Sequence, residues 1–378
     1  MGDRIQTEIG EIPINWEISS ILEETEFVTD YVANGSFSSL SSHVKYRSEP
    51  DYAVLIRLND FNRGFDGEFV YVDEYAYKYL KKSKLIGGEL IISNVGANAG
   101  TVFLAPRLEL PMTLGPNSVM LNFKNGNGFY YYWFRSSIGQ HFLDGIIGGS
   151  AQPKFNKTSF RAMKIPVPPL PEQKAIASVL SSLDDKIDLL HRQNKTLEAM
   201  AETLFRQWFI EEADDEWEEV SITDLFEVRD GTHDSPKQKE IGNKLLTSKH
   251  ILKNHLDFEN AYLISEEDYE SVNKRSKVET NDILFSMIGT IGLIYMEQSE
   301  KIDYAIKNIG LFKTSQNTEW VYFTYLWLNS TLGNDFIHEH RSGSTQEYIS
   351  LGSLRSIVFN IPSTSSINEF NDIVKAYF

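Results

Sequence analysis

The sequence contains no cysteine among its 378 residues, so neither disulfide bonds nor thiolate metal sites can stabilise it. It also lacks any apolar run of about 18 residues, the length that a membrane-spanning helix needs. Its first residues, Met1 to Gln6, are mostly polar and do not resemble the apolar centre of a signal peptide. We therefore expect a cytoplasmic protein that does not contact a membrane.

A surplus of basic residues, the usual mark of a protein that binds duplex DNA, is missing as well. The formal net charge is −17, which taken alone argues against contact with phosphates. Much of the acidic excess lies in two clusters, Asp214 to Glu219 and Glu266 to Glu270, whereas residues 31 to 165 are slightly basic. Because local patches decide phosphate contact, the total charge does not exclude DNA binding.

Motifs for catalysis are absent too. The only Pro-Pro pair, Pro168-Pro169, is not preceded by Asn or Asp and not followed by an aromatic residue, so the motif of an amino-methyltransferase is missing. No G-x-x-x-x-G-K-[ST] phosphate loop occurs. The pairs His250/His255 and His338/His340 lack the i, i+4 spacing of a helical metal site, and we interpret them as solvated or loop residues. We expect no metal site and no enzymatic activity in this chain.

The chain does contain a long internal repeat. With 41% hydrophobic residues, 378 residues suffice for two folded domains. Lys84 to Gly96 aligns without gaps on Lys277 to Gly289. Further matches occur in the same order: Trp16 with Trp217, Arg57–Phe61 with Thr247–Ile251, Tyr71 with Tyr262, Gly149–Gln152 with Gly343–Gln346, and Ile165–Pro166 with Ile361–Pro362. We interpret the chain as two copies of one domain.

Each copy shows a mixed pattern of strands and helices. The short apolar runs Leu90–Ser93 and Ile283–Ser286 end in glycine-rich turns, which is typical of buried strands. Phe129–Phe134 and Trp320–Leu328 precede serine-rich breaks and are interpreted as amphipathic helices over a sheet. Since no repeated crossover pattern is visible, the predicted fold class is α+β.

A long helix is predicted between the copies. The prolines of Pro166–Pro171 favour an extended start, and Glu172 to Phe209 contains neither Gly nor Pro. Alternating steps of four and three residues define a coiled-coil seam on a helix that would be roughly 55 Å long at about 1.5 Å per residue. The seam consists of Ile176, Leu180, Leu183, Ile187, Leu190, Asn194, Leu197, Ala201, Leu204 and Trp208.

This seam needs a covering surface. Residues 367–378 begin a second helical pattern through Ile367, Phe370, Val374 and Tyr377, but it is too short to cover the first. We therefore expect another chain to bury the seam, unless the natural C-terminus has been cut away or the seam folds back on its own domains. Asn194 either sets the register of the pairing or faces solvent.

Pro168 to Ile176 (PPLPEQKAI) at the start of this helix, together with the two Gly-Ser-x-Gln segments, resembles the specificity (S) subunits of type I restriction-modification enzymes. Phe155 to Leu190 carries the most specific part of the resemblance, and Asn34–Phe37 and Asp230–Pro236 add to it. It implies two tandem target recognition domains, residues 1–165 and 213–362. A central helix (166–212) and the start of a short, truncated C-terminal helix (363–378) would complete the chain.

The resemblance also implies partners. Each recognition domain would read one half of a bipartite double-stranded DNA target, and the helices would dock two methyltransferase (M) subunits. Those subunits would bind S-adenosylmethionine, so this chain needs no cofactor of its own. A restriction (R) subunit can join such a complex. The short C-terminal helix departs from the family and puts the two-sided docking in doubt.

Candidate DNA contacts are polar and cationic residues in loops, because phosphates and base edges are recognised by such groups. The segments 36–47 and 232–239 differ between the copies and are therefore favoured as base readers, whereas the shared Gly-Ser-x-Gln turns either contact bases or only close the loop. The candidates are Ser36, Ser38, Ser39, Lys45, Tyr46, Arg47, Asn98, Gln152, Lys154 and Asn156 in the first copy, and Thr232, His233, Lys237, Lys239, Lys249, Arg341, Ser344 and Gln346 in the second.

Two other functions remain as alternatives at this point. An acidic protein that mimics DNA and inhibits a DNA-binding enzyme would also explain the charge of −17. A self-sufficient methyltransferase or nuclease is disfavoured by the missing motifs.

Overall fold

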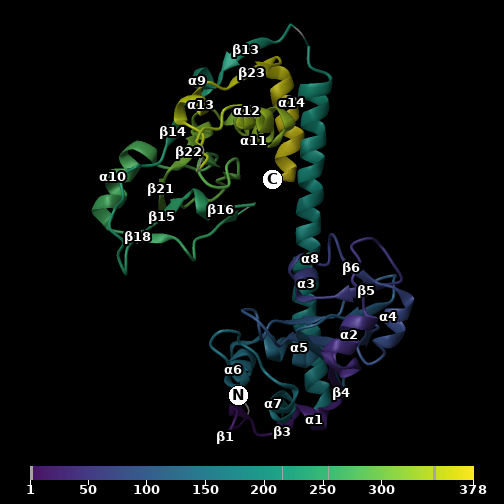
Figure 1. Ribbon diagram of the computed structural model, residues 1–378. Coiled ribbons are helices and arrows are strands. Elements are labelled where there is room, and N and C mark those ends of the chain that lie inside the picture. The colour runs from purple at the N-terminus through teal and green to yellow at the C-terminus, as the bar shows by residue number, and fades with distance from the viewer. Residues whose placement is uncertain (1–2, 215, 254, 344–345) are drawn as a thin grey trace. The chain divides into compact units, whose positions relative to one another are not determined.

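The computed structural model describes residues 3–214, 216–253, 255–343 and 346–378. The chain divides into two compact units, residues 1–188 and 189–378. The boundary lies inside the long helix α8 (Leu170–Arg206), the continuous teal helix of Figure 1. Within the described residues, none of the helices combines the length and the apolar character that crossing a membrane would require.

Unit 1 combines short strands with short helices ahead of α8. Its strands are β1 (Arg4–Thr7), β2 (Gly10–Pro13), β3 (Glu17–Ser20), β4 (Thr25–Asp30), β5 (Ala53–Ile56), β6 (Val70–Val72), β7 (Lys84–Leu85), β8 (Leu90–Ser93), β9 (Val102–Leu104), β10 (Met112–Leu114), β11 (Ser118–Phe123) and β12 (Lys164–Val167). Its helices are α1 (Ile21–Glu24), α2 (Phe37–His43), α3 (Leu58–Asn62), α4 (Glu74–Tyr79), α5 (Gly128–Arg135), α6 (Ser137–Ile146) and α7 (Lys157–Ala162).

Unit 2 follows the same plan after the end of α8. Its strands are β13 (Glu218–Ser221), β14 (Val228–Asp230), β15 (Asn243–Thr247), β16 (Ile251–Leu252), β17 (His255–Leu256), β18 (Tyr262–Ile264), β19 (Ile283–Ser286), β20 (Ile294–Met296), β21 (Tyr304–Lys307), β22 (Ile309–Phe312) and β23 (Val358–Ile361). Its helices are α9 (Ile222–Leu225), α10 (Glu266–Ser276), α11 (Val321–Asn329), α12 (Thr331–Glu339), α13 (Leu351–Arg355) and α14 (Thr364–Val374).

The sheets of the two units have the same topology. The order β4-β11-β8-β9 in unit 1 corresponds to β14-β22-β19-β20 in unit 2, and all neighbours in both sheets are antiparallel. A second sheet in each unit contains one parallel pair, β5 with β10 or β15 with β21; this sheet has four strands in unit 1 and three in unit 2. The predicted duplication and the α+β fold class are therefore confirmed.

The register of one repeat match is wrong by two residues. Ser20 pairs with Lys164 in unit 1, and Ser221 pairs with Val358 in unit 2. These pairs make Val167–Pro168, not Ile165–Pro166, the counterpart of Ile361–Pro362. The sequence comparison matched the Ile-Pro letters, whereas the strand pairing aligns the fully buried side chains of Ile165 and Phe359.

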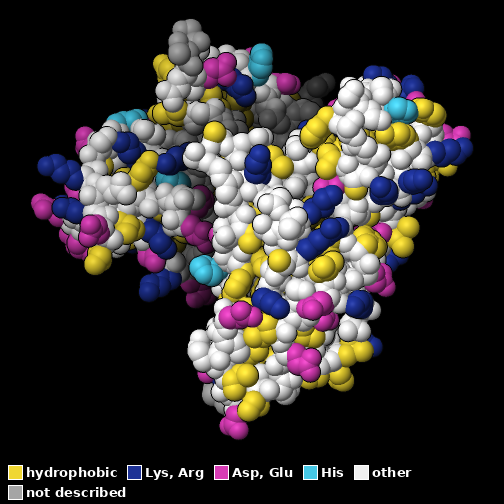
Figure 2. All heavy atoms as spheres, turned by 60° about the horizontal axis from the view of Figure 1, so that its bottom comes forward, with side chains coloured by type: hydrophobic (Ala, Val, Ile, Leu, Met, Phe, Trp, Pro, Cys, Tyr) yellow, Lys and Arg dark blue, Asp and Glu magenta, His cyan; other side chains and the backbone are white. Residues whose placement is uncertain are grey.

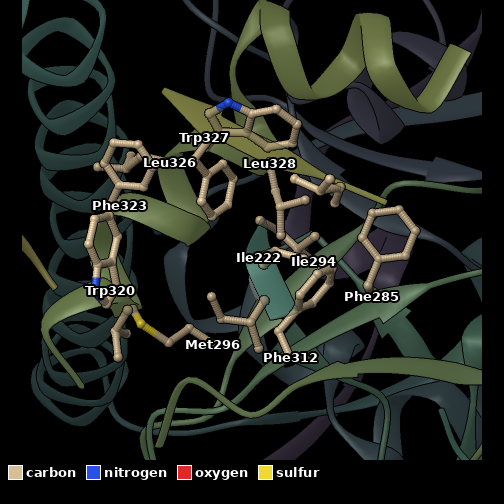
Figure 3. Close-up of a cluster of buried hydrophobic side chains, with 14 of the residues drawn as sticks. Ile222, Phe285, Ile294, Met296, Phe312, Trp320, Phe323, Leu326, Trp327 and Leu328 are labelled. Carbon is tan, nitrogen blue, oxygen red and sulfur yellow. The ribbon is translucent and has the colours of Figure 1, made fainter. Parts of the chain in front are cut away.

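Most predicted helices and strands are confirmed, but one predicted amphipathic helix is buried around most of its surface. The apolar runs at residues 90–93 and 283–286 are fully buried strands, and α5 forms where a helix was expected. The second predicted helix begins one residue late, at Val321, and is not amphipathic, because side chains from Val321 to Leu328 are buried around most of α11. Figure 3 shows Phe323, Leu326 and Trp327 of α11 beside Ile222 and Phe312 in the core of unit 2.

The long helix is confirmed and begins at Leu170, two residues before the expected Glu172. Its start is held by unit 1, because Trp16 Nε1 donates to Glu172 Oε2 (3.1 Å) and buried Gln173 Nε2 donates to the carbonyl of Pro168 (2.8 Å). After Arg206 it continues as a π-helical turn, Gln207–Glu211, which unit 2 packs against.

Candidate DNA-recognition and partner-docking surfaces

A cleft of about 900 Å³ in unit 1 contains three of the predicted DNA-contact residues. Gln152, Lys154 and Asn156 line it together with Tyr31 and Phe37. More than a hundred residues of sequence separate these two groups. The cleft is therefore the strongest candidate for DNA contact in this unit.

The turn that carries Gln152 and Lys154 has a defined backbone. Gly148 and Lys154 exchange two backbone hydrogen bonds of 2.9 Å, and Gly149 has a φ of 98°, which favours glycine. Gln152 and Lys154 are exposed, whereas the Oδ1 of Asn156 accepts from the backbone of Ser159 (2.8 Å) and caps α7. Gln152 and Lys154 can therefore contact a ligand, whereas Asn156 stabilises the start of α7.

Residues 36–47 do not form the expected loop. They contain helix α2, which Ser36 caps by accepting from the backbone of Ser39 (3.3 Å). The Ser39 hydroxyl lies 2.7 Å from that of Tyr79. The loop prediction was wrong because serines that suggest a flexible segment also serve as helix caps and side-chain anchors. Ser38 and Lys45 are exposed, and Lys45 Nζ donates to the carbonyl of Ser41 (2.8 Å).

Arg47 is engaged by two carboxylates. Its guanidinium lies 2.9 Å from Asp51 and 3.2 Å from Asp73. The pKa of Asp73 is lowered mainly by a hydrogen bond from the backbone N–H of Ala76. The hydrogen bond and the positive charge of Arg47 lower it further. A phosphate would have to compete with both carboxylates for Arg47. Tyr46, which is 52% exposed, donates to Tyr31 (3.4 Å), a residue of the cleft.

Asn98 lies in an exposed turn between β8 and β9, outside the cleft. Its backbone carbonyl accepts from the hydroxyl of Thr101 (2.9 Å). The turn of Asn98 is nevertheless joined to the turn of Gln152 and Lys154, because the backbone N–H of Gly96 donates to the carbonyl of Pro153 (2.9 Å).

In unit 2 the segment 232–239 is a loop, as expected. Buried Asp230 anchors its start, because His233 Nε2 lies 2.8 Å from Asp230 Oδ2 and Arg275 pairs with the other oxygen. Thr232 donates its backbone N–H to the carbonyl of Ile306 (3.1 Å). His233 and Thr232 are thus held in place. The ammonium-bearing side chains of Lys237 and Lys239, farther along the loop, are exposed.

The remaining predicted residues of unit 2 are divided between two places. Lys249 donates to the Tyr262 hydroxyl (2.6 Å) and its Nζ lies 4.3 Å from the centre of the Tyr262 ring. Arg341 pairs with Glu347 (3.4 Å), and Gln346 is exposed close by in sequence. Ser344 lies outside the described residues.

The described residues of the two Gly-Ser-x-Gln turns share several backbone features. Gly149 and Gly343 both have a φ near 97°, and a Cβ on either would collide with the carbonyl oxygen of Gln152 or Gln346. The bridge from Gly148 to Lys154 recurs from Ser342 to Tyr348. Because the fold alone explains the glycines, the shared turn has a structural role whether or not its glutamines contact bases.

Sequence reasoning missed three residues at these surfaces. Phe37 at the start of α2 is 80% exposed and lines the unit 1 cleft, but a search for polar readers passed over it. Lys157 Nζ donates to buried Asp30 (2.8 Å) at the same cleft, and in unit 2 Lys307 donates to Ser235 (2.5 Å) in the candidate loop. The sequence could not predict these contacts, because each of them joins segments that are far apart along the chain.

The histidine His250 is not solvated, contrary to expectation. It is 1% exposed, its Nδ1 accepts from the backbone of Thr247 (2.8 Å), and its Nε2 lies 3.0 Å from the carbonyl of Asn260. Burial lowers its pKa. Asp60 performs the same capping task in unit 1, where it accepts from the backbone of Arg57 (2.8 Å). In the described part of the chain, no group of three or more His, Asp or Glu residues is arranged to hold a metal ion.

The seam of α8 is open only in its middle. Leu183, Ile187 and Leu190 are 56%, 50% and 42% exposed. The expectation that another chain buries most of the seam is wrong at both ends, where the alternative of burial by the chain's own domains holds, because each unit covers the end of the helix that it holds. Ile176 packs on the core of unit 1, Ala201 is buried in unit 2, and Leu204 and Trp208 pack on the core of unit 2. Leu180 and Leu197 are half-buried.

Asn194 lies on the exposed part of α8, so within this chain the solvent-facing alternative describes it. Exposed Val179 and Met200 also lie outside the buried ends of the helix. The open middle of α8 is thus an apolar stripe with one polar residue.

Basic and acidic side chains are interspersed over the surface. Figure 2 shows dark blue Lys and Arg side chains on the left and on the right of the view, with magenta Asp and Glu side chains among them. Exposed Lys78 lies on α4, exposed Lys81 and Lys82 follow this helix, and Lys78 is paired with Glu74 (2.8 Å). A net charge of −17 therefore coexists with local basic areas.

Comparison with known proteins identifies the family. The sequence matches the type I restriction modification DNA specificity domain twice, over residues 30–199 and 214–376. It is 23% identical to the MjaIX specificity subunit of Methanocaldococcus jannaschii, with 99% of this chain and 89% of the relative covered. Identity to the EcoKI specificity subunit of Escherichia coli is 22%, with 93% and 80% covered.

A solved structure supports the same fold. The S subunit of the type I restriction-modification system of M. genitalium superposes with a TM-score of 0.57 at 15% identity, covering 96% of this chain and 89% of that one. The two matched segments together take up most of the chain and coincide with the repeated topology. The chain therefore belongs to the family of type I restriction-modification DNA specificity domains and carries two copies of the domain.

Proposed function

We propose that the chain is the specificity subunit of a type I restriction-modification system, in which two recognition domains read a bipartite DNA target and direct an adenine-N6 methyltransferase to it. The observation that carries this proposal is the duplication: two domains of one family lie at the two ends of a single long helix. The family match favours a DNA reader over an acidic DNA mimic.

The unit 1 cleft has the chemistry that duplex recognition requires. A glutamine side chain can bind the N6 and N7 edge of adenine, and a lysine can contact a phosphate. Gln152 and Lys154 are both exposed on one turn of this cleft. Phe37, which lines the same cleft and is exposed, has the apolar surface that packs on thymine methyl groups. In unit 2 the anchored loop with Lys237 and Lys239 would contact DNA in the place of this cleft.

Partner docking would use the open middle of α8. Leu183, Ile187 and Leu190 expose an apolar stripe on a helix, the pattern by which coiled-coil partners associate. We propose that two methyltransferase subunits dock here, that they bind S-adenosylmethionine, and that a restriction subunit joins the assembly. This chain would contribute no catalytic group and no cofactor.

The test is to express the chain with a type I methyltransferase subunit encoded next to it and to map methylated adenines in the host DNA. The expected result is one split sequence, modified only when both proteins are present. Methylation by the methyltransferase subunit alone at the same sequence would contradict the proposal.

A binding experiment separates a reader from a DNA mimic. The purified methyltransferase subunit is mixed with labelled DNA, and the chain is then titrated in. A specificity subunit creates a shifted complex, whereas a mimic removes any complex already formed. Incubating the chain alone with DNA and labelled S-adenosylmethionine should give no transfer of the methyl group.

A further inference from the structure

The two units share a buried aspartate at the same position of their antiparallel sheets. Asp30 is the last residue of β4 and pairs with Val119 of β11, and Asp230 is the last residue of β14 and pairs with Gly310 of β22. The pairing of β11 with β8 and of β22 with β19 places Val119 and Gly310 at matching positions of the repeat. The two aspartates are therefore structural counterparts, and both are buried.

In unit 1 this position belongs to the candidate reading cleft. Asp30 lines the cleft together with Gln152 and Lys157. The Nζ of Lys157 donates to Asp30 Oδ1 (2.8 Å), which also accepts from the backbone of Ala33 (2.8 Å). Because a buried carboxylate without a partner is costly, Asp30 holds the ammonium group of Lys157 at the cleft.

Unit 2 has a leucine where unit 1 has Lys157. Asn156 and Ser350 cap α7 and α13 in the same way, each by accepting from the backbone N–H of the third residue along the chain. The residue after the cap is Lys157 in unit 1 and Leu351 in unit 2. Since Leu351 cannot neutralise Asp230, another segment has to supply the positive charge.

Two exposed side chains contact Asp230 instead. Arg275, at the end of α10, donates from Nη2 to Asp230 Oδ1, and His233 Nε2 lies 2.8 Å from Asp230 Oδ2. The Asp230 side chain is only 3% exposed, whereas the side chains of Arg275 and His233 are 60% and 66% exposed. One buried carboxylate thus fixes two polar groups that reach the surface.

Arg275 is held at its backbone as well as at its guanidinium. Its carbonyl accepts from Arg229 Nη1 (3.0 Å), and the next residue, Ser276, is fully buried. A guanidinium carries five N–H donors in a rigid plane, and the contact with Asp230 engages Nη2, so donors remain for a second acceptor. A side chain that is already oriented loses less conformational entropy when it binds.

We propose that Asp30 and Asp230 are positioning residues of the two recognition domains, and that Arg275, oriented by Asp230, recognises a guanine in the half-site that unit 2 reads. Guanine presents N7 and O6 on its major-groove edge, and a guanidinium can donate to both. A shared aspartate that holds Lys157 in one unit and Arg275 in the other would let one scaffold read two different half-sites. This inference rests on the proposed function.

The experiment uses the full chain in complex with a type I methyltransferase subunit encoded next to it. Mapping of methylated adenines first gives the split target sequence. Anisotropy titrations then measure binding of the complex to duplexes in which each G·C pair of the target is replaced in turn. The measured quantity is the preference for G·C over the other base pairs at each position.

Arg275→Lys keeps a positive charge for Asp230 but removes the planar pair of donors. We expect the preference for one G·C pair in the unit 2 half-site to fall at least about tenfold, with the other half-site unaffected. Lys274→Ala changes the exposed cation beside Arg275 on α10 and should leave every base preference unchanged.

Asp230→Asn tests the positioning role. It keeps the shape of the side chain but removes the charge that orients Arg275, so the preference for the same G·C pair should fall. Combined with Arg275→Lys it should cause no further loss at that pair, because the two residues act as a unit. Urea denaturation checks that Asp230→Asn is folded, and the exposed change Arg275→Lys carries the test if it is not.

Several outcomes would overturn the inference. A unit 2 half-site without any G·C pair would do so before a variant is made, and so would an unchanged base preference in Arg275→Lys. Weaker binding to all duplexes with the same preference would assign Arg275 to a phosphate instead. By contrast, the absence of methylation at any sequence with the unaltered chain would refute the proposed function itself, and the inference with it.

Discussion

Gln152 and Lys154 lie on one turn but would act on DNA in different ways. A lysine that contacts a phosphate adds affinity for every sequence, whereas a glutamine that contacts a base edge adds affinity for one base pair. The exposed position of both on the unit 1 cleft allows each role. Their two substitutions therefore provide a direct test of how unit 1 reads DNA.

Lys154→Gln should weaken binding of the methyltransferase complex to specific and nonspecific DNA alike and lower the slope of log affinity against log salt by about one. Gln152→Ala should cost about 1–3 kcal/mol at one base pair and leave nonspecific binding unchanged. Anisotropy titrations at several salt concentrations measure both. Lys78→Gln, which changes an exposed lysine paired with Glu74, is the control. Identical effects of the Lys154 and Lys78 changes would count against the cleft.

His250 gives unit 2 a pH-dependent stability. Burial lowers its pKa below the ordinary value of 6.5, so the unfolded chain binds the proton more readily than the folded one. The contribution of neutral His250 to the free energy of unfolding is therefore fully present above about pH 6.5. It declines as the pH falls from 6.5 toward the lower pKa of His250 in the folded state. Protonation also removes the acceptor that Nδ1 offers to the backbone of Thr247.

His250→Asn should make the stability of unit 2 less dependent on pH. An Asn oxygen can still accept from Thr247, but the contact with Asn260 is lost, so we expect a cost of roughly 1 kcal/mol at neutral pH. Urea denaturation at about pH 7.5 and about pH 5.5 measures the difference. His255→Asn, at an exposed position, should retain the pH dependence of the unaltered chain. An unchanged pH dependence in His250→Asn would refute the assignment.

Helix α8 shows how one element serves two purposes. Its ends are anchored in the cores of the units, through Ile176 at one end and Phe205 at the other, and its middle is left exposed. An exposed apolar stripe costs solubility and is retained where a partner covers it. The polar residue Asn194 would then limit which partners fit the stripe.

Ile187→Glu should reduce association with the methyltransferase subunit by at least about tenfold, because a carboxylate would be buried in an apolar contact. The stability of the isolated chain should change by less than about 0.5 kcal/mol, since Ile187 is 50% exposed. Co-purification and denaturation measure the two effects. Asp185→Lys changes a charge on the opposite face of the helix and should leave association intact; equal losses in both variants would contradict docking on this stripe.

The two units together explain how one chain could recognise a split target. Each unit has its own sheets and its own core, so a change in one reading surface need not disturb the other. A continuous helix of 37 residues connects them. Recognition of two half-sites would then be modular.

Replacing residues 213–362 with the corresponding domain of another family member should change one half of the methylated sequence and preserve the other half. Methylome mapping of a host that expresses the chimera with its methyltransferase subunit provides the measurement. A chimera that alters both halves would show that the units do not read independently. The reciprocal exchange of residues 1–165 is the matched control.

Much of this architecture is encoded in local patterns. The heptad steps of Ile176 to Trp208 identified α8, and the ordered matches between Lys84–Gly96 and Lys277–Gly289 identified the repeat. Such patterns are readable because helix and strand periodicity depends on neighbours in the sequence. The serines of α2 misled the interpretation since the same residue type begins helices and fills loops.

Local sequence patterns did not predict the contacts between residues that are distant in the sequence. The meeting of Phe37 with Gln152 in one cleft, the burial of His250, and the covering of Leu204 and Trp208 depend on which surfaces come together after folding. Periodicity along the chain establishes which elements form, but long-range packing selects which of their side chains remain exposed to meet a partner.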